Sequence, residues 1–498
     1  MRSMNHHGWI GIIIAGGLTL GLLGWGSLRA QESGREKNEK KQPPGPRGAK
    51  APALPAGQQA LPINLPTALQ LANAQAIDIQ VASQRIEVAA AQLDRAQKLW
   101  LPTIFFGTDY YRHDGQIQET PGPVFGASRS SFMVGAGPSA VFAVSDAIFE
   151  PLSARQVLAA REASFQAAGN DTMLAVAEAY FSVQQARGDL AGAQDAVRRT
   201  EDLLQRVEKL VAGGLSPEVE VTRARADLAR RRQTIRVAED RWRISASDLQ
   251  RILRLEPTAL VEPQEPPQLE VTLIHLDRPV DELIPVALTN RPELAAQQAL
   301  VQATLARLRQ ERLRPLIPSV LLRGSSTPVT GTLAGGLYGG GPNSFMGNFS
   351  ARSDFDLQFL WELQNLGFGN RARVNERRGE HEISILELFR LQDQVAADVV
   401  QTFTLAQSAA ERMKDAEAEV RDAVDSVQKN LLGVSQTKRL TGNLLILVIR
   451  PQEVTAAIQA LAQAYGDYYG AAADYNRAQF RLYRALGHPA QLVQISKN

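Results

Sequence analysis

The polar side chains that invite a chemical role lie along one stretch, residues 345–362, in which charged and apolar residues alternate. Its polar positions include Arg352, Asp354 and Asp356. Because successive side chains of an extended chain point to opposite faces, the pattern predicts a strand with one charged and one apolar face. Its apolar face is suited either to lipid, with the charged face towards water, or to the second layer of a soluble sheet.

The apolar face of this stretch is carried by its odd-numbered positions. They are Phe345, Gly347, Phe349, Ala351, Ser353, Phe355, Leu357, Phe359 and Trp361. A weaker alternation runs over residues 132–144, where the apolar positions include Phe132, Val134 and Phe142. Two long two-faced strands in different halves of the chain make a membrane barrel a stronger candidate than either strand does alone.

The sequence gives little support to catalysis or to metal binding. The six histidines show no metal-ligand spacing. They are His6, His7, His113, His275, His381 and His488. The chain has no cysteine, which excludes disulfides, thiolate metal sites, a cysteine nucleophile and an acylated N-terminal cysteine. We expect no enzymatic activity, no catalytic residues, no cofactor and no bound metal.

A glycine-rich stretch at residues 335–341 invites comparison with a phosphate-binding loop. It has no following lysine and no helix start, and it lies between two predicted strands, so a surface loop is the better interpretation. The net charge of the 498-residue chain is only +2, which predicts no nucleic-acid partner. A mean hydropathy of −0.19 argues against a bundle of membrane helices.

The N-terminus has the layout of a secretory signal peptide. Basic residues precede an apolar run at residues 10–23 and small residues follow it, so residues 1–30 are predicted to be cleaved off. The alternative is an uncleaved membrane anchor. Residues 31–62 are rich in proline, lysine and glutamine and are predicted to form a disordered linker.

Four heptad series predict long antiparallel coiled-coil hairpins. Apolar residues recur every seven positions over residues 176–211, 221–249, 399–434 and 454–482, and in the first of these series they are branched. Alanine occupies much of the second row in the longer series, which lets helix backbones approach closely. A helix of this length needs partners beyond one small core, most simply helices of further copies of the chain.

The body of the chain is predicted to be one unit written twice, because an Ile/Leu-Pro-Ser/Thr junction closes a helix and opens a strand in each half. The expected boundaries follow in chain order: a first repeat at 63–260, with a helix, a strand pair at 101–149 and a helical hairpin at 152–254; a linker at 261–279; a second repeat at 280–489, with a helix, a strand pair at 317–363 and a helical hairpin at 370–486; and a C-terminal tail at 490–498.

The two hairpin tips differ in length. The first is a compact turn that contains Gly213, Gly214, Leu215 and Ser216 before a proline. The second spans residues 433–451 and includes Gly433, Gly442 and an apolar run at 444–449. That run is either packed back on the helices or exposed as a partner surface, and the sequence leaves both possibilities open.

Two strand pairs supply only four strands, too few to close a barrel around a usable channel. Unpaired strand edges are not tolerated in lipid, so the chain is expected to oligomerise. A trimer would give a closed barrel of twelve strands, which the helices of the three chains would continue away from the membrane. The fold class expected is therefore mostly α with a membrane β-barrel.

Three stretches carry a resemblance to a known family. They are residues 177–181, Ala-Glu-Ala-Tyr-Phe, residues 212–219 at the first tip, and residues 474–487 at the end of the last helix. With the duplicated order of strand pair and long hairpin, the chain resembles the TolC-like outer membrane efflux protein family over about residues 65–489. The resemblance implies a homotrimeric channel in the outer membrane whose α-helical barrel extends into the periplasm.

The resemblance also implies partners and roles for residues. Substrate would arrive from an inner-membrane pump through a periplasmic adaptor protein, and outer-membrane lipid would surround the barrel. Adaptor contact and gating would lie at the hairpin tips, which include Gly213, Gly214, Leu215, Ser216, Gly433 and Gly442. The second tip is longer than the family's short turn, and the N-terminal cysteine that anchors many members to lipid is absent.

The expected function is a passive channel of a tripartite efflux or secretion system, with Arg352, Asp354 and Asp356 facing the lumen. The alternative is a periplasmic coiled-coil scaffold without a pore. The two differ at residues 345–361, whose apolar face contacts lipid in the channel and lies under a second layer in the scaffold. Neither composition nor periodicity identifies the substrate, the pump or the adaptor.

Overall fold

The computed structural model describes residues 60–118, 122–323, 333, 335–342, 345–439 and 445–487. The predicted signal peptide, nearly all of the predicted N-terminal linker and the predicted C-terminal tail lie outside these residues. Among the described helices, none has both the length and the apolar character needed to cross a membrane.

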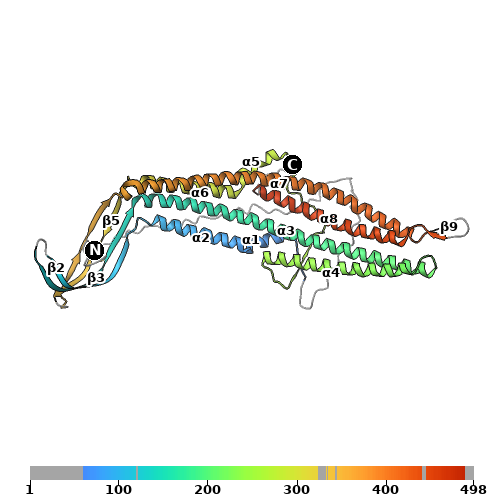
Figure 1. Ribbon diagram of the computed structural model, residues 1–498, viewed down its shortest axis with the longest axis horizontal. Coiled ribbons are helices and arrows are strands. Elements are labelled where there is room, and N and C mark those ends of the chain that lie inside the picture. The colour runs from blue at the N-terminus through green and yellow to red at the C-terminus, as the bar shows by residue number, and fades with distance from the viewer. Residues whose placement is uncertain are drawn as a thin grey trace, which may run out of the picture. The chain divides into compact units, whose positions relative to one another are not determined.

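The order of helices, strands and a long helical hairpin occurs twice along the chain (Figure 1). The first pass consists of β1 (Ala60–Ile63), α1 (Leu65–Gln75), α2 (Ile77–Gln97), β2 (Thr103–Gln118), β3 (Val124–Ala143), α3 (Val144–Ala212) and α4 (Val219–Leu253). The second consists of β4 (Leu260–Pro263), α5 (Val280–Asn290), α6 (Pro292–Leu313), β5 (Ser319–Arg323), β6 (Gly335–Pro342), β7 (Gly347–Ser353), β8 (Asp356–Leu360), the 3-10 helix η1 (Gln364–Gly367), α7 (Phe368–Gly433), β9 (Thr437–Arg439), β10 (Leu445–Leu447) and α8 (Pro451–Ala485).

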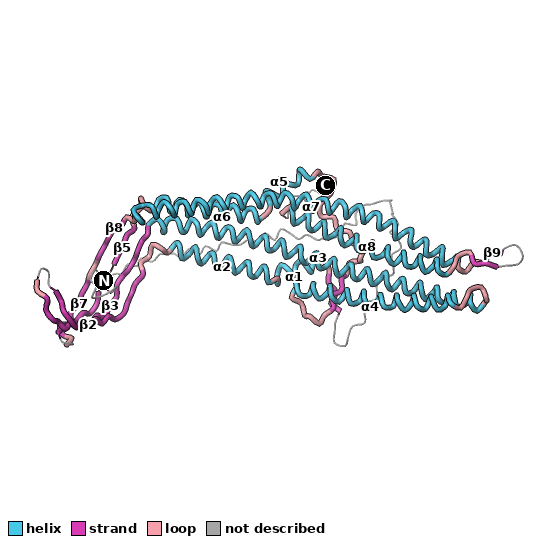
Figure 2. Tube along the Cα trace, in the orientation of Figure 1, coloured by secondary structure: helices cyan, strands magenta, loops and turns pink. Residues whose placement is uncertain are grey.

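One antiparallel sheet gathers the strands that precede the two long hairpins (Figure 2). β3 pairs with β2 on one side and with both β5 and β6 on the other. β8 pairs with β5, and β7 pairs with β6. The described sheet thus has four strand paths, and its two edges are β2 and the path made by β7 and β8.

The long two-faced strand predicted over residues 345–362 is divided in the structure. β7 ends at Ser353 and β8 begins at Asp356, so residues 354 and 355 lie between them. The division falls where the neighbouring strand changes from β6 to β5. The alternation of more and less exposed side chains nevertheless continues across the gap, because residues 352, 354 and 356 are all partly buried between exposed neighbours.

Helix α3 continues β3 without a loop. It begins at Val144, eight residues before the expected hairpin, and it includes Pro151 in its interior. A proline lacks the amide that would bond the preceding turn, so the sequence favours a later start. Packing outweighs this preference here, because Asp146 in the first turn of α3 accepts hydrogen bonds from Gln310 of α6 at 2.9 Å and from Arg314, just after α6, at 2.7 Å.

Next to the sheet, four helices lie side by side in the order α2, α3, α6, α7 (Figure 1). Further from the sheet the order becomes α4, α3, α8, α7. Buried apolar residues from the predicted heptad series fill the space between these helices, among them Val176, Val183, Val420 and Val427. α3 and α7 run through both levels, while α2 and α6 are replaced by α4 and α8.

The predicted inter-repeat linker is bound firmly to α8. The buried amide of Asn476 accepts a hydrogen bond from the amide of Val271 at 2.8 Å. The buried amide of Gln479 accepts from Leu273 at 3.1 Å and from Ile274 at 3.0 Å. Residues 271–274 of this linker belong to no helix or strand, and they satisfy backbone donors through two side chains of the last helix.

Two glycines of α3 make room for tyrosines of α8. A Cβ atom at Gly188 would lie 2.4 Å from the ring of Tyr469, and one at Gly192 would lie 2.9 Å from Cβ of Tyr465. The two hairpins can therefore approach each other closely only where α3 has no side chain.

Replacing Gly188 by alanine should destabilise the contact between the hairpins by about 1–3 kcal/mol, because the added methyl group overlaps a buried ring. The change can be measured as a lower midpoint in thermal unfolding followed by circular dichroism. Gly466→Ala on α8 is a matched control, since nothing lies within 4 Å of its Cβ position. It should be neutral or stabilising by about 0.5–1 kcal/mol, and equal losses in both variants would contradict this account.

Asp189 on α3 is partly buried, and the positive charge of Arg241 on α4 acts on its carboxyl group. Burial raises the pKa of Asp189 from its ordinary value near 3.8 to about 6, against the opposing effect of Arg241. The folded state therefore keeps a proton that the unfolded chain releases between these two values.

The free energy of unfolding should accordingly fall as the pH rises from about 4 to about 6, because the folded state must then bury a charge. Asp189→Asn removes this loss. The variant should unfold at a higher temperature than the parent chain at neutral pH, and the difference should vanish near pH 4. A difference that is independent of pH would show that the carboxyl group is not the cause.

Candidate channel-lining face and helical tips

One face of the sheet is apolar across all four strand paths. The strand register brings Phe142, Val320 and Phe359 level with one another, and likewise Phe132 with Tyr110. Side chains on this face are exposed in the single chain, and Phe106 and Phe355 reach 84% and 70%. An apolar surface of this extent needs a cover from outside the described chain.

The opposite face carries the predicted polar residues Arg352 and Asp354. Their side chains form an ion pair with a separation of 2.8 Å between Nε and Oδ2. The Arg352 guanidinium also lies over the ring of Tyr338, at 4.9 Å from its centroid. Sequence analysis found the two charged residues but had no signal for the tyrosine, whose position depends on the pairing of β6 with β7.

Asp356, the third predicted polar residue, lies on the same face but apart from that ion pair. Its carboxylate accepts a hydrogen bond of 2.9 Å from Gln358. The register places it opposite Arg323 on β5. The polar face thus carries the paired charges of Arg352 and Asp354 and, apart from them, the carboxylate of Asp356.

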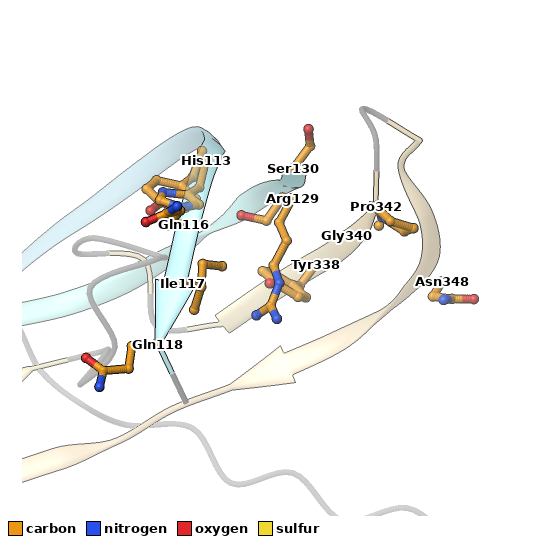
Figure 3. A pocket seen from close by; sticks show the side chains of 13 residues that line it. His113, Gln116, Ile117, Gln118, Arg129, Ser130, Tyr338, Gly340, Pro342 and Asn348 are labelled. Atoms are coloured by element: carbon orange, nitrogen blue, oxygen red, sulfur yellow. The ribbon is translucent and has the colours of Figure 1, made fainter. Parts of the chain in front are cut away.

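At the end of the sheet furthest from the helices, the polar face encloses a cavity of about 890 Å³ (Figure 3). The side chains around it come from β2, β3, β6 and the start of β7, and they include Tyr111, His113, Arg129 and Tyr338. His113 Nε2 and Ser130 Oγ are buried and have no hydrogen-bond partner in the described part of the chain. The cavity is open, and its lining is partly polar and partly apolar.

The first helical tip is built as its sequence predicts. Gly213 follows α3, and Gly214 has a φ of +73°, a left-handed conformation that favours glycine. The amide of Leu215 bonds the carbonyl of Leu210 at 2.9 Å and closes the end of the helix. Leu215 is exposed, and Ser216 leads into α4 through a proline.

The second tip extends beyond its helices as a small antiparallel pair, β9 with β10. Gly433 is buried, and a Cβ atom there would lie 2.3 Å from the side chain of Ile449, so the glycine makes room for that side chain. Ile449 packs into the core between the hairpins, whereas Val448 beside it is 51% exposed. The apolar run is thus partly packed and partly exposed, and Gly442 lies outside the described residues.

Two side chains that sequence analysis missed tie the tips together. The Arg206 guanidinium of α3 donates to the carbonyl of Leu431 at 3.2 Å and to the hydroxyl of Ser435 at 3.0 Å. Glu220 of α4 is buried and accepts a hydrogen bond of 3.1 Å from Gln452 of α8. Neither residue belongs to the apolar heptad rows, so the series gave no indication of them.

Above the tips, Tyr465 of α8 lies within reach of Asp195 on α3. Burial, reinforced by the Asp195 carboxylate, raises the pKa of Tyr465 to about 12, so the hydroxyl keeps its proton at physiological pH. Asp195 also pairs with Arg199 at 2.6 Å. Within the described residues, no group of three or more histidine, aspartate or glutamate side chains is arranged to hold a metal ion.

Comparison with known proteins identifies one matching family. Residues 68–253, which include α2, β2, β3, α3 and α4, match the sequence model of the outer membrane efflux protein family. No protein with a curated description matches the chain in sequence.

Solved structures match the fold over most of the chain. The outer-membrane channel OprN superposes with a TM-score of 0.66 at 16% identity, covering 92% of this chain and 99% of its own. The CmeC outer membrane channel of Campylobacter jejuni gives 0.67 at 14%, covering 85% and 86%. The MtrE outer membrane channel of Neisseria gonorrhoeae, in its open state, gives 0.64 at 15%, covering 90% and 97%.

Removing the guanidinium of Arg206 should loosen the second tip. Arg206→Ala leaves Ser435 and the Leu431 carbonyl without their donor, which should favour local opening by about 1 kcal/mol. Limited trypsin digestion should then cut after Lys438 or Arg439 roughly fivefold faster.

Arg225→Ala is the matched control for this experiment. Arg225 pairs with Glu208 at 2.9 Å within the first hairpin, and neither residue is bonded to the second tip. It should leave the rate of cleavage at the second tip unchanged. Equal acceleration in both variants would mean that the second tip is not held by Arg206.

Proposed function

We propose that the chain is a TolC-like outer membrane efflux protein and that three copies of it close into one tube, the outer-membrane channel of a tripartite efflux system. In this proposal an inner-membrane pump and a periplasmic adaptor hand over the substrate, and the tube is a passive conduit. One observation carries the proposal. From the sheet to the helical tips, the single chain has two lateral edges that differ from each other and lack a partner.

The edges can be followed from the sheet to the tips. In the described sheet they are β2 on one side and β7 with β8 on the other. Beside the sheet they are α2 and α7, and further away α4 and α7. Because the two edges differ, copies associate head to tail, and such contacts form a ring when the rotation closes. Three copies of four strand paths give a closed barrel of twelve strands.

The height of the apolar band fits a membrane. From Phe132 to Phe142, β3 covers ten residues, or about 33 Å along the strand. At the usual tilt of about 40° this corresponds to an apolar band roughly 25 Å tall, the height found in outer-membrane barrels. On β2 the outward face changes beyond Tyr110 to Arg112 and Asp114, which marks the upper limit of the band.

An apolar contact between copies is available beside the barrel. A groove of about 800 Å³ between α2 and α3 is lined by Val81, Val88 and Val157. The free edge of α7 exposes Ile383 and Phe389 near the same height. Packing the second set into the first would remove both from water, which supports the ring.

Within the tube, Arg352, Asp354 and Asp356 would line the passage, where water solvates their charges. The same charges on the lipid face would cost several kcal/mol each near the midplane. At the far end, Gly213, Gly214, Leu215, Ser216 and Gly433 mark the tips that would contact the adaptor. The β9–β10 extension would give the second tip a contact surface that a short turn lacks.

The rival function, a periplasmic scaffold without a pore, requires a second layer over the apolar strand face. Phe355 and Phe359 are exposed, and no helix among the described residues covers them. No observation therefore favours the scaffold. Fractionation separates the two functions, because the channel predicts heat-resistant oligomers in the outer membrane and the scaffold predicts a soluble periplasmic protein.

The assignment of the two faces predicts unequal effects of one replacement at adjacent positions. Phe355→Arg places a charge on the lipid face and should cost about 2–4 kcal/mol near the midplane, so that assembly fails. Asp354→Arg places the same side chain towards water and should leave assembly intact. The measurement is the amount of heat-modifiable oligomer in the outer-membrane fraction. Equal amounts for both variants would refute the assignment of Phe355 to the lipid face and of Asp354 to the water face.

A further inference from the structure

The surface of α4 that turns away from α3 is basic. The helix carries nine arginines and five acidic residues. Several arginines are used within the hairpin, as in the pair of Arg232 with Glu201. Arg230 and Arg236 are exposed and have no carboxylate within salt-bridge distance among the described residues. Ile244, 65% exposed, lies on the same surface.

The surface of α7 that turns away from α8 is acidic at the corresponding end. Over residues 411–429 the helix has six acidic and four basic residues. Glu411, Asp415, Asp422 and Asp425 follow one another at helical spacing opposite the buried valine row, and all four are exposed. Asp425 is paired with Lys429 at 2.5 Å, and Asp415 and Asp422 have no salt bridge in the described chain.

The two surfaces lie at the same height along the bundle. The bond from Arg206 places residue 431 of α7 beside residue 206 of α3. The pairs Glu208–Arg225 and Glu201–Arg232 place residue 206 of α3 beside residue 227 of α4. α7 runs parallel to α3 and α4 runs antiparallel, so stepping nine residues back along α7 and nine forward along α4 brings Asp422 level with Arg236.

From this match we infer that α4 of one copy docks on α7 of the next through an electrostatic seam, with Arg236 against Asp422 and Arg230 within one turn of Asp425. The inference rests on the proposed trimer and specifies its contact in the periplasmic half. Rotation about an axis along the bundle preserves height, so residues that are level in one chain are level across the contact.

The opposite charges of the two surfaces indicate that each surface binds a second copy of the chain. A second copy offers the opposite charge at the matching height and continues the edges that run down from the sheet. The seam differs in kind from the apolar contact of α2 with α7 beside the barrel. Exposed ion pairs are weak and are screened over about 8 Å at physiological ionic strength, so the seam is sensitive to salt.

The absence of cysteine makes cross-linking a direct test. Arg236→Cys and Asp422→Cys are introduced into two differently tagged full-length chains, which are expressed together and treated in intact cells with a short bis-maleimide. A covalent species that carries both tags should form at least fivefold faster than in the control described next. Each single variant alone should give none, because like positions of a ring lie far apart.

The control pairs Arg236→Cys with Glu411→Cys. It uses the same two surfaces but shifts the acidic position eleven residues along α7, or about 16 Å. Equal rates for the matched and the shifted pair would overturn the seam. Cross-linking of Asp422→Cys to the adaptor in place of the second tagged chain would overturn it as well.

Charge exchange provides a second readout. Arg236→Glu and Asp422→Arg should each lower the temperature at which the oligomer dissociates on unheated gels, and the double variant should recover most of the loss. Losses that add in the double variant would refute the pairing. If the unaltered chain forms no outer-membrane oligomer at all, the proposed channel fails; if the oligomer forms and only the matched cross-link is missing, the seam alone fails.

Discussion

The unpaired edges of the sheet are the constraint on which the rest of this structure depends. The amide and carbonyl groups that β2, β7 and β8 turn away from their neighbouring strands have no partner within the described sheet, and each such group costs several kcal/mol in lipid. The apolar face of the same strands has no cover either. The proposed ring answers both needs, because its closure would pair the edges and turn the apolar face outward to lipid.

The helices inherit their places from the sheet. β3 passes into α3 without a loop, so the position of a strand in the sheet fixes the position of the helix that follows. Close packing then keeps the hairpins in register, through the bare backbone of Gly188 against Tyr469 and through the linker that Asn476 and Gln479 hold on α8. The order of the strands in the sheet thereby determines the positions of the helices as far as the tips.

Much of this architecture follows from periodicity alone. The heptad rows predicted which residues are buried, as Val176 and Val427 illustrate, and alternation predicted that Asp354 and Phe355 point to opposite faces. These signals are local, because each depends on the geometry of a single helix or strand.

What sequence reasoning missed depends on partners distant in the chain. The gap at residues 354–355 is set by a change of neighbouring strand, and the start of α3 ahead of Pro151 is accompanied by contacts from α6. The bond from Arg206 to Leu431 joins residues 225 positions apart. A polar side chain beside an apolar row gives no sign of which distant carbonyl it will reach, so the connection between the tips emerged only from the structure.

The two edges of the chain differ mechanically. One edge is a single proline-free helix, α7, whose 66 residues run from the sheet to the second tip. The other edge is assembled from β2, α2 and α4. Helix α2 is separated from the preceding helix α1 by Ala76, whose backbone is extended. A force applied at the second tip is therefore transmitted towards the sheet along one continuous helix, while the opposite edge can bend where its elements meet. Each contact between copies would thus place a rigid edge against a flexible one.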